Sequence, residues 1–244
     1  MRNYKITIQY DGTNYHGWQV QPNGRTIQGE LTRVLSLLDH RHVTVHGAGR
    51  TDAGVHAEGQ VASFLLERDF EPHALREAIN GNLDRDVRVI EAEPVQMSFN
   101  ARFSAKLKTY RYQVWTAPVV SPFIYRYVYH HSGPLDLGEI ERAAAALVGT
   151  HDFSAFAGVG SEIEDRVRHL KRLDARHQED LIIITAEADG FLRYMVRTIV
   201  GTLIEAGRGR RAAESVAQVL ESRNRANAGA TAPACGLTLV RVDY

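Results

Sequence analysis

Alternation of apolar and polar side chains predicts β-strands in both halves of the chain. The pattern is clear in YKITIQY (4–10), where Tyr4, Ile6, Ile8 and Tyr10 fall on one face of a strand. Similar patterns predict further strands over 42–46, 60–67, 87–95, 106–115, 168–177, 181–188 and 237–244.

Apolar residues spaced three or four positions apart predict helices between these strands. Over 26–40 the spacing places Ile27, Leu31 and Val34 on one helical face. Further helices are predicted over 72–80, 137–149, 191–207 and 212–222. Residues 11–25 are polar and contain glycines, so they are expected to form a long loop.

The order of these elements predicts the fold class, which is α+β. Each half of the chain approximates β-α-β-β-α-β, the ferredoxin-like arrangement. We expect two related halves, 1–105 and 106–244, that share a mostly antiparallel sheet with helices on one face. The other face, or a cleft between the halves, would then be free for a ligand.

Composition is that of a globular protein of the cytoplasm. The 244 residues are 44% hydrophobic and 24% charged, which is enough for a real core. The single cysteine, Cys235, excludes an internal disulfide and suits a reducing compartment. The N-terminus follows a strand pattern rather than that of a signal peptide, and no apolar run approaches the roughly eighteen residues of a membrane span.

Charge is balanced overall but unevenly chosen. The formal net charge is zero, and the 29 cations comprise 25 arginines and 4 lysines. The guanidinium fork suits bidentate contact with phosphate and stacking on bases. A GC-rich coding sequence would give the same bias, so it supports nucleic-acid binding only weakly.

Metal and phosphate-loop chemistry find no support in the motifs. The 11 histidines include the group His40, His42 and His46, but none of them has a paired ligand spacing elsewhere. The segment GAGRTDAG matches neither a dinucleotide-binding nor a P-loop pattern. We therefore expect no metal site and no nucleotide cofactor.

Three polar residues stand out, each with a structural alternative. Asp52 lies in GRTDAGVHA (49–57), where it could be a turn residue bonded to backbone amides. Arg197 stands among apolar residues of the 191–207 helix, so it must be paired, face a groove or extend to solvent. Tyr110 could be a packed aromatic, or it could stack on an exposed base.

Six ordered blocks carry a resemblance to a known family. They are YDGTNYHGWQVQPNGRTIQGEL, GAGRTDAGVHAEGQVASF, NARFSAKLKTYRY, GTHDFSAF, FLRYMVRTIVGTLIEAGRG and APACGLTLVRVDY, which run from residue 10 to the C-terminus. Together they closely resemble the TruA family of tRNA pseudouridine synthases. The resemblance makes the turn-only interpretation of Asp52 a poor one.

The resemblance implies an enzyme that converts uridine to pseudouridine at positions 38, 39 and 40 of the tRNA anticodon stem-loop. It also implies a homodimer with no metal and no organic cofactor. By motif match, Asp52 would be the catalytic carboxylate and Arg197 its partner. Arg50 would hold or displace the flipped nucleotide, Tyr110 would stack on the uracil, and Leu237 would line the pocket. The alternatives are a catalytically silent RNA-binding protein on the same scaffold and an enzyme of free nucleosides.

Overall fold

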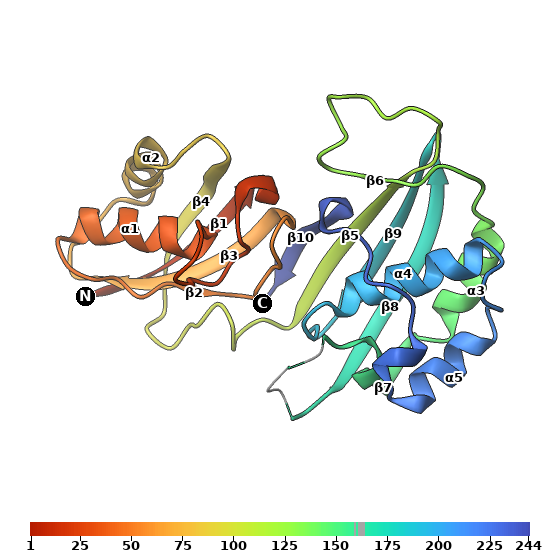
Figure 1. The fold of residues 1–244 in the computed structure, drawn as a ribbon. Helices are drawn as coiled ribbons and strands as arrows, with labels where there is room; N and C mark the ends of the chain where they lie inside the picture. The colour runs from red at the N-terminus through yellow and green to blue at the C-terminus, as the bar shows by residue number, and fades with distance from the viewer. Residues whose placement is uncertain (159, 161–163) are drawn as a thin grey trace. The chain divides into compact units, whose positions relative to one another are not determined.

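The chain forms two compact units in this computed structural model, which describes residues 1–158, 160 and 164–244. The first unit contains Met1–Lys106 and Leu239–Tyr244, and the second contains Leu107–Thr238 (Figure 1). The last six residues belong to the first unit because they pack against it. The Tyr244 hydroxyl donates to the Ala101 carbonyl at 2.9 Å, and the Lys106 amide donates to the Asp243 carbonyl at 2.8 Å.

Three long strands make up the sheet of the first unit, in the order β4-β1-β3. They are β1 (Arg2–Tyr10), β3 (His56–Leu66) and β4 (Val87–Val95), and both pairings are antiparallel. The short strand β2 (His46–Gly47) adds to β3, and β10 (Leu237–Asp243) neighbours β3 in the strand order. The predicted face is confirmed, since Tyr4, Ile6 and Ile8 are fully buried and Tyr10 is 5% exposed.

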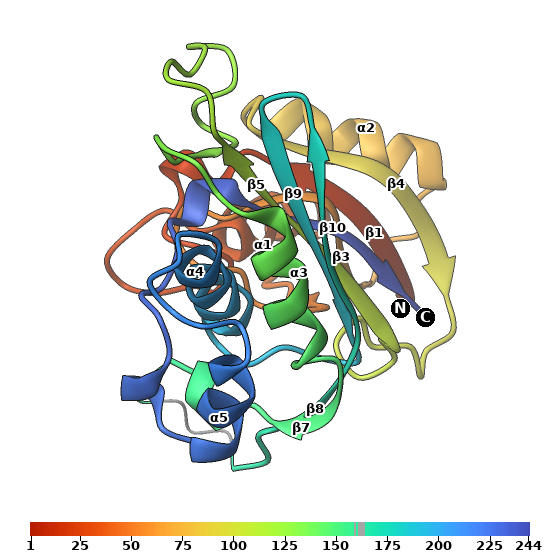
Figure 2. The same ribbon diagram turned by 90° about the vertical axis from the view of Figure 1, so that its right-hand side faces the viewer.

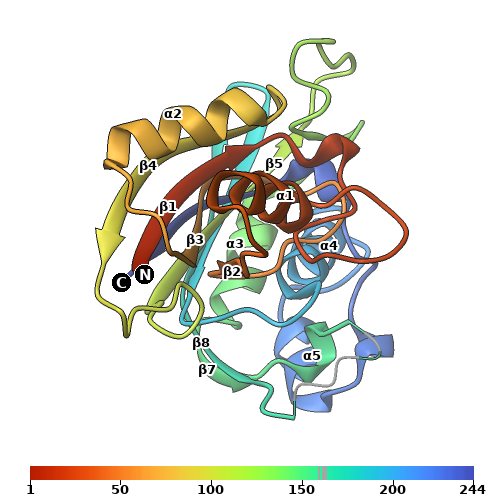
Figure 3. The same ribbon diagram turned by 90° about the vertical axis from the view of Figure 1, so that its left-hand side faces the viewer.

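Two helices contact each other over this sheet (Figures 1 and 3). They are α1 (Ile27–Asp39) and α2 (Pro72–Asn82), and α2 also contacts β4. The Thr26 hydroxyl caps α1 by accepting from the Gly29 amide, which is the N-cap bond that threonine favours. A short 3₁₀ turn, η1 (Gly12–Asn14), follows β1.

The second unit has four antiparallel strands in the order β5-β9-β8-β7. They are β5 (Leu107–Trp115), β7 (Gly149–Asp152), β8 (Val167–Gln178) and β9 (Leu181–Ala188), and β6 (Tyr129–His130) adds to β5 in parallel. The helices are α3 (Leu137–Ala145), α4 (Met195–Gly207) and α5 (Ser215–Ser222), with short 3₁₀ turns η2 (Ser154–Phe156), η3 (Arg225–Asn227) and η4 (Ala234–Gly236). Helix α3 contacts both α4 and β8 (Figure 2).

The predicted α+β class with mostly antiparallel strands is confirmed, but several boundaries are wrong. The strand expected over 42–46 is reduced to His46–Gly47. The helix expected over 191–207 begins at Met195, because Tyr194 adopts a left-handed conformation with φ 63° that a helix cannot include. The helix expected over 137–149 ends at Ala145. The sequence pattern did not predict β6 and β7, because β6 has only two residues and β7 only four.

Candidate active site

The loop that contains Asp52 joins β2 to β3, and buried polar side chains form hydrogen bonds with it. The Gln60 amide donates to the Gly49 carbonyl at 2.9 Å, and the Tyr10 and Thr51 hydroxyls bond each other at 2.9 Å. Tyr10, Gln60 and Thr51 are all buried, whereas Arg50 is exposed and Asp52 is partly exposed. The loop therefore alternates, with Gly49 and Thr51 directed inward and the two candidate site residues on its accessible side.

The Tyr10 hydroxyl, which bonds this loop through Thr51, stays uncharged. Burial raises the pKa of Tyr10 to about 12, although its bonds with Thr51 and Gln60 oppose that rise. Tyr10 therefore remains protonated at neutral pH and keeps both hydrogen-bonding capacities. A protonated phenol in this position fixes the loop without adding a charge that would compete with Asp52.

A second loop, residues 11–25, packs directly against the first. The Trp18 amide donates to the Thr51 carbonyl at 3.0 Å, and the Gly54 amide donates to the Tyr15 carbonyl at 3.3 Å. Gly17 permits this approach, because it has φ +86° and a β-carbon there would lie 2.6 Å from the Thr51 carbonyl oxygen. The chain turns after Asp52, whose backbone carbonyl accepts from the Val55 amide at 3.1 Å.

Arg197 is one of only two residues of α4 that are not buried, the other being Glu205. Its Nε donates to the Ala232 carbonyl at 2.8 Å, and its own carbonyl accepts from the Ala232 amide at 3.0 Å. Its guanidinium carbon lies 5.3 Å from the centre of the Tyr194 ring. Arg197 is thus held by contacts with the protein while part of it remains accessible, and its role in the site stays a prediction.

Arg193 precedes α4, which begins at Met195, and it contacts the same ring as Arg197. It is exposed, its guanidinium carbon lies 4.7 Å from the Tyr194 ring centre, and its Nη2 donates to the Tyr194 hydroxyl at 2.9 Å. The Tyr194 ring is therefore in contact with two guanidinium groups.

Gly201 brings the segment 229–232 onto α4. A β-carbon at Gly201 would overlap the Ala230 carbonyl oxygen, so only glycine allows this approach. The Thr202 hydroxyl accepts from the Gly229 amide at 2.9 Å on the same helix. This packing supplies the Ala232 carbonyl to Arg197, and a glycine inside a strongly apolar helix was its signal in the sequence.

The Tyr110 side chain is buried in the protein and not exposed on its surface. It is 6% exposed and meets the Phe191 ring edge-on at 5.1 Å. Tyr112 is fully buried two positions on, and its hydroxyl donates to the Pro233 carbonyl at 2.8 Å. Burial raises the pKa of Tyr112, and the nearby Arg197 charge opposes that rise. The packed interpretation thus describes this structure, and the stacking role of Tyr110 stays a prediction.

Leu237 begins β10 and is 5% exposed. It follows Gly236, where a β-carbon would lie 2.7 Å from the Tyr112 ring. The structure thus places Arg50 and Asp52 on one loop of the first unit, and Tyr110, Arg197 and Leu237 in the second. Sequence reasoning missed Thr51, Gln60 and Tyr194, and it treated Tyr10 as core only.

Neither a metal-binding group nor a membrane-spanning helix is found among the described residues. In 1–158, 160 and 164–244, no group of three histidine, cysteine or acidic side chains is placed to hold a metal ion. Across the same ranges, every helix is too short or too polar to cross a membrane.

Comparison with known proteins shows the family of this chain. The family model described as tRNA pseudouridine synthase matches residues 6–104 and 143–244. A tRNA pseudouridine synthase A of Acetivibrio thermocellus is 43% identical over 244 residues, which is 100% of both chains. That of Halalkalibacterium halodurans is 44% identical over 97% of this chain and 90% of its own, and that of Moorella thermoacetica is 44% identical over 98% of each. The chain therefore belongs to the tRNA pseudouridine synthase family and is an isomerase.

Proposed function

We propose that this enzyme converts uridine to pseudouridine at positions 38, 39 and 40 of the tRNA anticodon stem-loop, with Asp52 as the catalytic carboxylate. The observation that carries the proposal is the loop around Asp52. Buried bonds at Gly49 and Thr51 hold this loop, while Arg50 and Asp52 remain accessible. A reacting carboxylate needs such a rigid support to keep its geometry.

The reaction breaks the glycosidic bond, turns the uracil and rejoins it through carbon. The formula does not change, so no oxidant, reductant or energy source is required, and we propose that no cofactor takes part. A carboxylate can stabilise or trap C1′ of the ribose, attack C6 of the base, or remove the 2′ proton. Each of these routes uses the ionised carboxylate of Asp52.

The other residues serve the substrate in this proposal. Arg197 pairs with Asp52 and offsets the loss of its hydration when RNA binds. The uracil must leave the base stack, which costs about a few kcal/mol, and contacts with Arg50, Tyr110 and Leu237 offset that cost.

We further infer that each unit is a ferredoxin-like half and that the enzyme is a homodimer in the cytoplasm, where its tRNA substrate is found. The element order β1-α1-β2-β3-α2-β4 of the first unit supports the first inference. The proposed homodimer and its cytoplasmic location rest on the family resemblance. Gel filtration with light scattering tests whether the protein is a dimer.

One experiment tests the function. The protein is incubated with unmodified tRNA, and pseudouridine, which has the mass of uridine, is read by chemical labelling at single-nucleotide resolution. Labelling at 38, 39 and 40 is expected. A silent RNA-binding protein would bind the tRNA without labelling it, and a nucleoside enzyme would convert free uridine instead.

Binding of tRNA should depend on salt although the net charge is zero. Arg50, Arg102, Arg208 and Arg210 are exposed, whereas Arg211 is paired with Glu205 at 3.1 Å. If the exposed arginines contact phosphates, log affinity falls linearly with log salt, by about 0.7 to 0.9 per contact. Titration of labelled tRNA at several salt concentrations measures the slope, and a flat response would rule out a charged RNA surface.

Tyr110→Phe and Tyr110→Ala should differ. If the ring stacks on uracil, Ala loses about 1 to 3 kcal/mol of productive binding and Phe keeps most of it. Ala also removes the ring contact with Phe191, so thermal unfolding of both variants must accompany single-turnover rates. Equal loss in both variants would assign the role to the hydroxyl instead of the ring.

A further inference from the structure

Residues 16–25 form a closed loop between η1 and α1. The base of the loop is joined by the His16 amide, which donates to the Arg25 carbonyl at 2.8 Å. Inside it, the Gln21 amide group donates to the His16 carbonyl at 2.7 Å. The Val20 amide donates to the Gln28 side chain at 2.9 Å, which ties the loop to α1.

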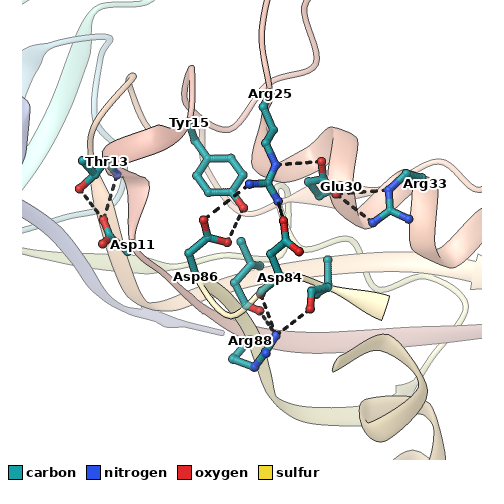
Figure 4. A network of polar contacts seen from close by, with 11 residues as sticks. Asp11, Thr13, Tyr15, Arg25, Glu30, Arg33, Asp84, Asp86 and Arg88 are labelled. Carbon is teal, nitrogen blue, oxygen red and sulfur yellow. Dashed lines mark hydrogen bonds and ion pairs between the residues drawn. The ribbon is translucent and has the colours of Figure 1, made fainter. Parts of the chain in front are cut away.

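Arg25 anchors this loop through its guanidinium (Figure 4). It pairs with Glu30 at 3.0 Å, with Asp84 at 2.6 Å and with Asp86 at 3.6 Å. The guanidinium carbon also lies 4.6 Å from the centre of the Tyr15 ring, whose hydroxyl donates to Asp86 at 2.7 Å. Three carboxylates from α1 and from the segment before β4 thus fix one side chain at the end of the loop.

The base of the loop also contacts the loop that contains Asp52. Gly17 lies against residues 51–53, and Trp18, which is 2% exposed, donates its amide to the Thr51 carbonyl. The Gly17 carbonyl accepts from the Ile27 amide at 3.2 Å, so the same residues also bind the start of α1. The loop is therefore a rigid neighbour of Asp52.

The exposed side chains between residues 17 and 24 are uncharged, and three of them carry amide groups. Gln19, Gln21 and Asn23 are exposed, and Val20 is 52% exposed. From residue 12 to residue 24 the chain has no Lys, Arg, Asp or Glu. Side-chain amides both donate and accept hydrogen bonds, which suits base edges and ribose hydroxyls, whereas phosphate contact favours cations.

We propose that the loop 16–25 is a preformed RNA-contact surface, in which Gln19 and Asn23 bind nucleotides next to the target uridine and Arg25 is a positioning residue. The proposal rests on the proposed function of Asp52. The loop lies beside Asp52, so an RNA that places its uridine at Asp52 would also meet the loop. A rigid scaffold that presents uncharged polar side chains on a loop is typical of recognition sites.

The test compares Gln19→Ala/Asn23→Ala with the wild-type enzyme in binding to an anticodon stem-loop RNA. The Kd should rise about tenfold or more, since contacts to base edges are lost. The slope of log Kd against log salt should stay unchanged, because no phosphate contact is removed. A Kd within twofold of wild type, or a slope that falls by about one contact, would overturn the proposal.

A matched control is Gln96→Ala. Gln96 is an exposed glutamine that follows β4, next to the strand end where Asn3 pairs with Val95. The loop 16–25 lies beyond the opposite end of β1, so this variant should bind and react as wild type does.

The role of Arg25 is tested by Arg25→Met and Arg25→Lys. Arg25→Met should raise the Kd as far as the double variant does, and adding it to the double variant should change little, because both remove one surface. Lys should restore part of the affinity, since it keeps the charge but loses the fork. A lower melting temperature with an unchanged Kd would show a purely structural role.

The two proposals fail differently. If the wild type binds the RNA but leaves its uridines unchanged, the proposed function fails. If the wild type converts uridine while the loop variants bind and react normally, only the loop proposal fails.

Discussion

Asp52→Asn is expected to abolish pseudouridine formation while leaving folding and tRNA binding intact. Asparagine has nearly the size of aspartate but lacks the negative charge and the nucleophilic oxygen. The loop should keep its shape, because the bonds made by Gly49, Thr51, Gly54 and the Asp52 backbone carbonyl are left in place by the substitution. Single-turnover labelling of tRNA and a binding titration measure the two properties separately.

The matched control is Glu91→Gln, which removes an exposed carboxylate from β4 without touching the loop. It should convert uridine at the wild-type rate. Substantial turnover by Asp52→Asn would refute the assignment of GRTDAGVHA as the catalytic loop. Loss of turnover together with loss of the folded state would refute the claim that the neighbouring residues hold the loop.

Arg197→Met is expected to lower the rate of pseudouridine formation, by an amount between a partial and a severe loss. At an effective dielectric constant near 20, a contact ion pair contributes up to about 4 kcal/mol before desolvation is deducted. Methionine also loses the Nε bond to the Ala232 carbonyl, so Arg197→Lys, which keeps the charge, separates the electrostatic effect from the positional one. Arg193→Met is the matched control, because it removes the other guanidinium beside Tyr194.

The effects of Asp52→Asn and Arg197→Met should be strongly non-additive. When the reacting carboxylate is already absent, losing its partner cannot lower the rate further. If Arg197 pairs with Asp52 as proposed, the double variant should regain some stability relative to Asp52→Asn, because the cation that lost its carboxylate is removed as well. Thermal unfolding and tRNA labelling of the four proteins complete the cycle, and additive losses of rate would argue against the pairing.

Local pattern was enough where a segment has one buried face. The strand β4 begins at Val87 and ends at Val95, as alternation predicted, and the face of β1 that carries Ile6 and Ile8 is fully buried. Family membership could also be predicted from the sequence, because the six ordered blocks resemble those of the family. The resemblance, rather than periodicity, singled out Asp52.

The apolar pattern failed at two element boundaries. Residues 42–45 alternate like a strand, and Val43 and Val45 are buried, yet only His46–Gly47 pairs with β3. Tyr194 lies within an apolar helical pattern, but its left-handed backbone delays the start of α4. Neither outcome is encoded in the spacing of apolar residues.

The sequence by itself determined the α+β class, most of the elements and the family, because apolar periodicity and contiguous motifs are local properties. Only the tertiary structure decided how the site residues are supported. Tyr10 reaches Thr51 across 41 positions, and Arg197 reaches Ala232 across 35. Such bonds depend on which strands and segments pack together, and that is settled by the burial of the whole core rather than by any one stretch of chain.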